Sequence, residues 1–204
     1  MRVSTHLFVA CSLLSAALPA IARNPELAAI YEADQAARAR PAEIDWTILL
    51  PEDRKRRERV LELLRAGEVR GAADYHHAAM VFQHGENLDD IRLAHALSTI
   101  AMSLAPDEKR YRWLTAASWD RIMTTQLQPQ WYGTQFQSDD SGMFLYPLAD
   151  GAVNDDDRKA MQVPTLAETG TQLQEIARMH GQSVNPDPPT IEQLRKTRQI
   201  APQE

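Results

Sequence analysis

Apolar residues recur at helical spacing along most of the chain, and this pattern predicts a mainly helical protein. In the clearest stretch, Leu93, Leu97, Ile100 and Leu104 follow one another at intervals of three or four residues. Proline, glycine and capping residues mark the ends of the apolar stretches. We therefore predict helices over about 25–40, 51–66, 74–84, 89–104, 107–127 and 165–180, with a connector over 46–50 and a short helical turn at 154–157.

The pattern changes after Pro129, where short aromatic-rich runs replace the amphipathic stretches. The runs 131–137 and 143–146 flank Ser138-Asp139-Asp140-Ser141-Gly142, which is typical of a tight turn. They predict a two-stranded β-hairpin.

These elements predict the domain organisation. Short loops between consecutive helices favour stacked, antiparallel helical hairpins. We expect a single, mainly α domain over 23–182, with the small β-hairpin in its C-terminal part. Residues 183–204 are rich in proline and polar side chains, and are predicted to form a disordered or loosely attached tail.

Residues 1–22 have the features of a cleaved secretory signal peptide. Arg2 precedes an apolar run over 7–18, and Ala20-Ile21-Ala22 is a small-x-small cleavage site. A membrane anchor is an alternative, although the run is shorter than the roughly 18 to 20 residues that span a bilayer. Cys11 after Val9-Ala10 allows a second alternative, a lipoprotein. We expect a periplasmic or secreted protein that has no membrane contact after cleavage.

Composition narrows the expected chemistry. Lysine and arginine total 22 against 28 acidic residues, a net charge of -6. Such a chain repels phosphate backbones, so nucleic acid is not an expected partner. The one cysteine, Cys11, leaves with the signal peptide, which excludes thiol chemistry from the mature chain. The basic run over 53–59 is interleaved with acids, and predicts a solvated helix face or, alternatively, a patch for an anionic ligand.

Three predicted helices each place polar groups beside an apolar face. The third carries His77 and His84 on one face with Gln83 nearby, the fourth carries His95, and the fifth carries Asp120 with Arg121 next to it. Asp34 and Arg38 are i,i+4 partners on the first helix. If these faces converge, the polar groups form one pocket. The candidate catalytic residues are His84 and Asp120, and the candidate ligand-binding residues are Gln83, His95, Arg121, Gln130, Thr134, Gln135, Asp34 and Arg38.

The residue types indicate what such a pocket can do. A carboxylate beside an imidazole orients the ring and stabilises its protonated form, so His84 and Asp120 could act as a general base pair. The forked donors of Arg121 suit a carboxylate or phosphate. The alternatives are that each histidine only packs against the core, and that Asp120 anchors the hairpin through buried hydrogen bonds. The ligand types also allow a metal site, but the spacing is not diagnostic, and neither a metal nor a cofactor is predicted.

A longer pattern surrounds these residues. Asp120-Arg121 is followed by Pro129-Gln130-Trp131-Tyr132-Gly133-Thr134-Gln135, and Phe82-Gln83-His84-Gly85 and Ala94-His95 precede it. The combination resembles a bacterial family of domains of unknown function, in which a basic residue often stands where this chain has Gln128. The stretch 78–117 also resembles a single Sel1-like or tetratricopeptide-like unit. The resemblance implies one domain and points at these polar positions, but it implies no reaction.

The sequence supports three functional hypotheses. The first is an exported protein that binds a small or extended ligand, such as a peptide, a glycan or a cell-wall fragment, in a polar pocket between helices. The second is a cell-envelope hydrolase that uses His84 as base, with Arg121 and Gln135 holding the substrate. The third is a structural interaction module whose polar cluster is only buried hydrogen bonding. The oligomeric state is not predicted.

Overall fold

The computed structural model describes residues 23–200, and the side chains of residues 23–198. The predicted signal peptide and Cys11 therefore lie outside the described residues, as do residues 201–204. Within the described part, no helix is both long enough and apolar enough to cross a membrane.

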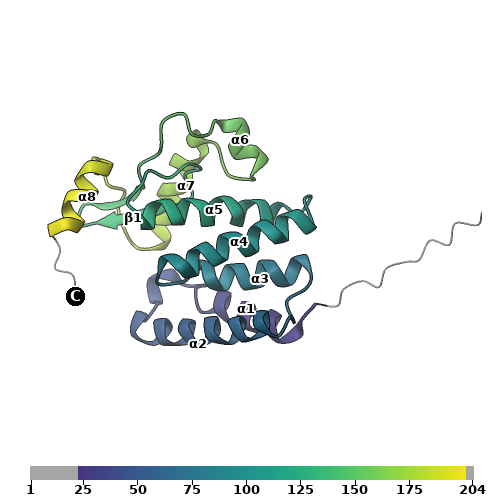
Figure 1. The fold of residues 1–204 in the computed structure, drawn as a ribbon. Coiled ribbons are helices and arrows are strands. Elements are labelled where there is room, and N and C mark those ends of the chain that lie inside the picture. The colour runs from purple at the N-terminus through teal and green to yellow at the C-terminus, as the bar shows by residue number, and fades with distance from the viewer. Residues whose placement is uncertain (1–22, 201–204) are drawn as a thin grey trace, which may run out of the picture.

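Five antiparallel helices form the main body of the protein (Figure 1). Because consecutive helices alternate in direction, the ends of the first, third and fifth lie at the same end of the stack as the beginnings of the second and fourth. The fourth helix packs between the third and the fifth. The prediction of a mainly α protein is confirmed. The helices are α1 (Pro25–Ala36), α2 (Trp46–Arg65), α3 (Ala72–Gln83), α4 (Leu88–Leu104) and α5 (Lys109–Thr125), with a 3₁₀ turn, η1 (Pro41–Glu43), between α1 and α2.

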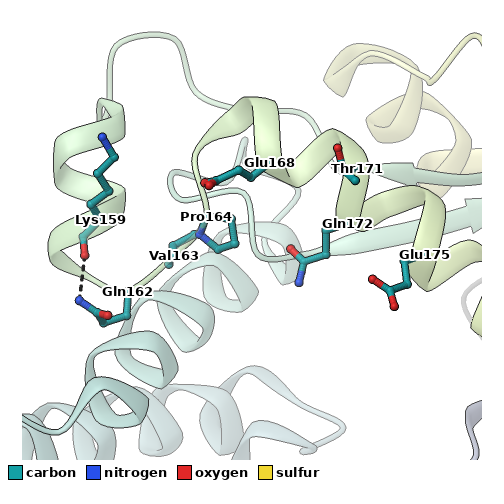
Figure 2. A pocket seen from close by; sticks show the side chains of 8 residues that line it. All are labelled: Lys159, Gln162, Val163, Pro164, Glu168, Thr171, Gln172 and Glu175. Carbon is teal, nitrogen blue, oxygen red and sulfur yellow. Dashed lines mark hydrogen bonds between the residues drawn. The ribbon is translucent and has the colours of Figure 1, made fainter.

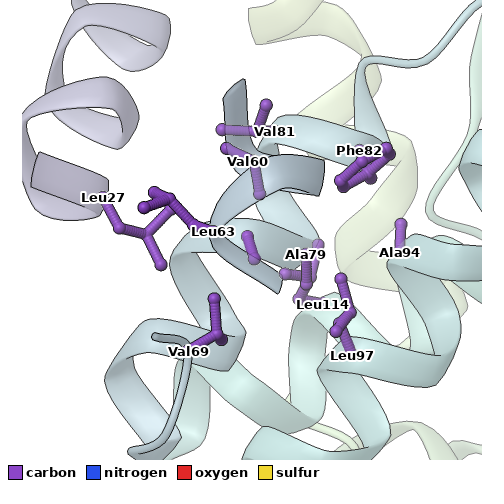
Figure 3. Packing of buried hydrophobic residues seen from close by; sticks show 11 residues of the cluster. Leu27, Val60, Leu63, Val69, Ala79, Val81, Phe82, Ala94, Leu97 and Leu114 are labelled. Atoms are coloured by element: carbon purple, nitrogen blue, oxygen red, sulfur yellow. The ribbon is translucent and has the colours of Figure 1, made fainter. Parts of the chain in front are cut away.

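Aliphatic side chains from all five helices meet in one core (Figure 3). Small residues on α3 and α4, among them Ala79 and Ala94, are fully buried and let the helices approach closely. Larger side chains fill the space around them. The core comprises Leu27, Val60, Leu63, Val69, Ala78, Ala79, Val81, Phe82, Ala94, Leu97 and Leu114. This core holds the helix ends in fixed positions relative to one another.

Helix α2 begins five residues earlier than predicted. The predicted connector over 46–50 is its first turn, and Pro51 lies inside the helix. Asp45 caps this start, because its carboxylate accepts a hydrogen bond from Thr47 N at 2.9 Å. A proline this close to a helix start leaves only one further carbonyl without its usual donor, so the helix continues through it. As a result Trp46, Leu50 and Asp53 lie on one helical face.

Helix α3 begins two residues before Asp74, which was predicted to cap it. The N-cap residue is Gly71, and Asp74 occupies the third helical position. Its buried carboxylate accepts hydrogen bonds from the backbone N–H groups of Asn24, Arg70 and Gly71. Asp74 therefore satisfies free donors at the helix start, and also ties the start of α1 to that of α3.

The C-terminal elements lie along one side of α5, with α6 (Asp155–Ala160) near its start and the hairpin and α8 (Ile191–Ile200) near its end (Figure 1). Strands β1 (Phe136–Asp139) and β2 (Gly142–Leu145) form the predicted hairpin, with Phe136 opposite Leu145. Residues 131–135 were predicted to start the first strand, but they form a loop. Two helices follow the hairpin, α6 and α7 (Leu166–Met179). The observed hairpin is therefore shorter than the predicted one.

The chain beyond residue 182 is more structured than its composition suggests. Asn185 donates hydrogen bonds to both carboxylate oxygens of Asp139, at 3.1 and 2.9 Å. A last helix, α8, follows, and Arg195 in it donates to Leu127 O at 2.9 Å. The sequence predicted a disordered or loosely attached tail over 183–204, whereas in the structure residues 183–200 include a helix and make these contacts. Specific polar contacts hold this segment, and they join residues that lie far apart in the sequence.

Two adjacent histidines of α3 are buried. His77 stacks on Tyr31 with 4.3 Å between ring centroids, and His76 packs beside it. Burial, with a smaller contribution from Arg110, lowers the pKa of His76 to about 3. Burial, with a smaller contribution from Arg23, lowers the pKa of His77 to about 4. Both rings are therefore neutral in the folded protein near pH 7.

This burial predicts a loss of stability in mild acid. In the unfolded chain both rings have a pKa near 6.5, so at pH 5 unfolding takes up about two protons. Their contribution is fully present above about pH 6.5 and is lost as the pH falls toward 4 and 3. Urea unfolding at several pH values between 7 and 5 should show this slope. In the double variant His76→Gln/His77→Gln, the free energy of unfolding should depend less steeply on pH. The control His180→Gln, at an exposed histidine, should keep the slope of the parent. Equal slopes in the two variants would contradict the assignment of this effect to His76 and His77.

Candidate functional site

A cavity of about 420 Å³ lies at the end of the stack where α1, α3 and α5 finish and α2 begins. Helix ends meet there, so polar side chains replace the aliphatic core. Its wall combines charged groups with the two apolar residues Trp46 and Leu50. The lining residues are Arg38, Trp46, Leu50, Asp53, His84, Gly85, Glu86 and Arg121.

One buried carboxylate organises this cavity. Asp34 has only 1% of its surface exposed, and its oxygens lie 3.0 and 3.1 Å from His84 Nδ1. Arg38 Nη1 donates to Asp34 Oδ1 at 2.9 Å, as the i,i+4 spacing predicts. Burial alone would raise the pKa of Asp34, but the His84 hydrogen bond and charge, together with Arg38, outweigh it and lower that pKa. Asp34 is therefore an ionised orienting group for His84.

The carboxylate that contacts His84 is not the predicted one. We expected Asp120, but Asp34 holds the imidazole, from a helix 50 residues earlier in the chain. Because His84 caps the end of α3, its ring projects toward the end of α1 rather than toward α5. With Nδ1 engaged, Nε2 is the ring nitrogen left for a ligand in the cavity.

Arg38 joins Asp34 to a second buried carboxylate, Asp53 on α2. Its two terminal nitrogens both contact Asp53, one of them at 3.2 Å from Oδ1. Asp53 also accepts from Arg56 Nη1 at 2.7 Å. Arg38 is thus held in a forked arrangement between two acids, and its charge is neutralised within the protein.

The basic run over 53–59 is only partly the solvated face that was predicted. Asp53 and Arg57 are buried, and they do not pair with each other. Arg57 instead donates to Glu86 at 2.8 Å and to His84 O at 3.3 Å. These bonds fix the turn after α3 that carries the candidate base.

Gly85 in this turn cannot easily be replaced. A Cβ placed on it would lie 2.2 Å from Asp90 Cβ and 2.9 Å from Phe82 O. The turn therefore packs tightly against the start of α4, and positions His84 at the cavity wall.

Arg121, in the last turns of α5, differs from the other arginines of the site. Its guanidinium has no hydrogen bond or ion pair with any residue from 23 to 198, and its Nε is buried without an acceptor. Burial, and to a lesser extent the charge of Arg38, lowers its pKa. A guanidinium keeps its charge at neutral pH. The cavity therefore contains a cation without a counter-ion in the described part of the chain.

A second cavity, of about 310 Å³, adjoins the first and shares Gly85, Glu86 and Arg121 with it. It extends between the end of α5, strand β1 and α8. Gln135 lines this second cavity, where its side chain donates to Ala117 O at 3.1 Å. Arg121 thus lies where two adjoining cavities meet.

Asp120 has a different role from the one predicted. It is fully buried, and its carboxylate accepts bonds from the backbone N–H groups of Trp131, Tyr132 and Thr134. The hydroxyl of Thr134 adds a bond of 2.8 Å. Burial raises the pKa of Asp120, and these hydrogen bonds oppose the rise without cancelling it. The contacts fit the alternative reading, in which Asp120 anchors the loop before the hairpin.

Three further predicted ligand-binding residues are also engaged within the fold. Gln130 is fully buried, and bonds Gln135 O, Tyr146 O and Gln135 N. Thr134 bonds Asp120, and Gln83 is buried, with its amide nitrogen 3.4 Å from Ala117 O. The hydrogen bonds of Gln130 and Thr134 shape the loop that carries Gln135.

His95 lies in a separate pocket of about 250 Å³, lined by His95, Thr115, Trp119, Trp131, Tyr132 and Met161. Its Nδ1 lies 3.2 Å from Thr115 O and 3.1 Å from Ser118 Oγ. The predicted polar groups therefore do not converge on one point. No group of three or more potential metal ligands is found among the described residues.

A wide surface hollow of about 770 Å³ lies between α6 and α7 (Figure 2). Its polar groups are partly engaged: Gln162 donates to Lys159 O at 3.1 Å, and Glu168 accepts from Thr165. This hollow is wide, and its other polar groups are solvated. It therefore provides fewer buried groups to bind a ligand than the two cavities at Arg121 do.

Sequence reasoning missed five residues of the main cavity: Trp46, Leu50, Asp53, Gly85 and Glu86. The signal for the first three was their i, i+4, i+7 spacing, which the proline at 51 concealed. Comparison with protein-family models, curated proteins and solved structures gives no significant match. The resemblance to the bacterial family therefore stays a prediction.

Proposed function

We propose that this protein binds a ligand that carries a carboxylate, in the cavity at the end of the helical stack, and that it does so in the bacterial cell envelope. The observation that carries the proposal is Arg121, a partly buried guanidinium with no acceptor among residues 23–198. Arg38 differs from it because Asp34 and Asp53 neutralise it. An uncompensated cation in such a place is costly to the free protein, and an incoming anion offsets that cost.

The rest of the cavity suits a ligand with an apolar part. Trp46 is 55% exposed and Leu50 is 37% exposed, although both are large hydrophobic residues. They stand one turn apart at the start of α2 and line the cavity that contains Arg121. A pocket with apolar walls and a few fixed polar groups is typical of small-molecule and peptide sites. We infer that the ligand places its carboxylate at Arg121 and an aliphatic or ring portion on Trp46.

Tryptophan and amide signals in nuclear magnetic resonance provide the test. The isotope-labelled chain from Arg23 to Glu204, which contains every described residue, is titrated with acetate, butyrate and butyramide. We expect saturable shifts around Arg121 with both acids, tighter binding of butyrate, and none with the neutral amide. Arg121→Gln should abolish these shifts, whereas Arg92→Gln, at an exposed arginine, should retain them. Equal responses in the two variants would refute the proposal.

A second candidate function, hydrolysis, is favoured by the contact between Asp34 and His84. A carboxylate that holds Nδ1 leaves Nε2 able to take a proton from water, which is the arrangement of a general base. The cavity wall contains no serine, threonine or cysteine, so water would be the nucleophile. Arg121 would then hold the substrate carboxylate.

Hydrolysis of mono-4-nitrophenyl succinate, an ester that carries a free carboxylate, and of short peptides at pH 7.5 tests this candidate. His84→Gln and Asp34→Asn should each lower a genuine activity by about 100-fold, because general-base catalysis contributes about that much. His180→Gln, at an exposed histidine, is the matched control. A rate that is the same in all three variants would show that the dyad is not catalytic.

A further inference from the structure

Strand β1 presents an open edge. Tyr146 N donates to Gln135 O at 3.1 Å, so residues 137 and 139 face β2 and residues 136 and 138 face outward. The other side of the sheet is already covered, because Met143 N donates to Ser183 O and Asn185 N donates to Met143 O, both at 2.8 Å. Within residues 23–200, β1 is therefore the edge with unpaired backbone groups.

This edge adjoins the Arg121 cation. The second cavity is lined by Arg121 together with Gln135, Phe136 and Gln137, the residues that lead into and begin β1. Arg198 of α8 lines the same cavity, and its guanidinium contacts Thr125 O at 3.5 Å. The one acid in the wall, Glu86, is already paired with Arg54 and Arg57. The cavity is therefore positively charged at the point where the open edge starts.

We propose that the site takes the C-terminal end of an extended peptide, whose terminal carboxylate pairs with Arg121 and whose backbone adds to β1 as a third strand. The proposal rests on the proposed carboxylate binding, and names the class of ligand. Outward backbone groups at Phe136 and Ser138 alternate as a third strand requires, and strand addition to an open edge is a common mode of peptide recognition. At about 3.4 Å per residue, the four residues of β1 accommodate about four peptide residues.

The test compares probes that differ by one group. The labelled chain from Arg23 to Glu204 is titrated with the tetrapeptide acetyl-Ala-Val-Ala-Val as the free acid, with its C-terminal amide, and with acetate. We expect the free acid to bind at least tenfold more tightly than either of the others, and to shift the amide signals of Phe136 and Ser138. N-methylation removes one peptide N–H group at a time. It should weaken binding at the alternate positions whose N–H faces β1, and leave binding unchanged at the positions between them.

Protein variants provide an independent check. Ser138→Pro removes the outward N–H, and proline is tolerated on an edge strand. This variant should bind the free-acid tetrapeptide more weakly than the parent does, and acetate as tightly as the parent does. The matched control Ser138→Ala should bind both probes as tightly as the parent.

Three outcomes would overturn the inference. If acetate binds as tightly as the tetrapeptide and N-methylation has no effect, carboxylate binding at Arg121 stands but strand addition to β1 is refuted. Binding of neither probe at Arg121 would remove both proposals. Sedimentation of the free chain as a dimer that Ser138→Pro dissociates would show that β1 pairs with a second copy instead.

Discussion

Asp120→Asn should destabilise the protein by about 2–5 kcal/mol, because several buried donors would lose their acceptor together. The carboxylate accepts bonds from three backbone N–H groups of the loop, those of Trp131, Tyr132 and Thr134, and from the Thr134 hydroxyl. Asparagine offers one oxygen and turns an N–H₂ group toward N–H donors. Urea unfolding of the chain from Arg23 onward measures the loss.

The control for this prediction is Asp140→Asn, at an exposed aspartate in the hairpin turn. It should change the free energy of unfolding by less than about 0.5 kcal/mol. If Asp120→Asn were as stable as the parent, Asp120 would not be the anchor of the loop. It would then return as a candidate for chemistry.

Arg121→Met should have the opposite effect, and raise the free energy of unfolding by about 1–2 kcal/mol. Methionine keeps an apolar stem of similar shape and removes a buried, unpartnered Nε together with an uncompensated charge. The same variant should lose carboxylate binding. A residue that opposes stability but supports binding is typical of a functional site.

The matched control is Arg92→Met, because Arg92 is exposed on α4 and paired with Asp89. Exposed ion pairs contribute about 0–1 kcal/mol, so this variant should be close to the parent. A loss of stability in Arg121→Met, comparable to that in Asp120→Asn, would mean that Arg121 is part of the architecture.

Local signals in the sequence predicted the helices well. Periodic leucines and capping residues set α4 and α7, and their observed bounds differ from the predicted ones by about one residue. The start of α2 was missed because proline usually marks a helix start, whereas Pro51 follows a turn that Asp45 already caps. The order beyond residue 182 was missed because it depends on single long-range contacts, such as that of Asn185 with Asp139.

The candidate site was predicted in part. The i,i+4 pair of Asp34 and Arg38 follows from helix geometry, and the structure contains it. The partner of His84 could not be deduced, since a contact across 50 residues depends on how α1 packs on α3. Asp120 next to Arg121 looked like one functional unit, but consecutive helical residues point about 100° apart. One of them therefore faces the loop, and the other faces the cavities.

The signal of the Arg121 Nε–H group in nuclear magnetic resonance tests the central claim most directly. In the chain from Arg23 to Glu204, it is followed while the free-acid tetrapeptide is added, with the C-terminal amide as control. We predict a saturable shift with the acid alone, because a carboxylate at the guanidinium changes the electron density at Nε. An Nε signal unmoved by the acid while other signals titrate, or moved equally by the amide, would contradict the assignment of Arg121 as the carboxylate site.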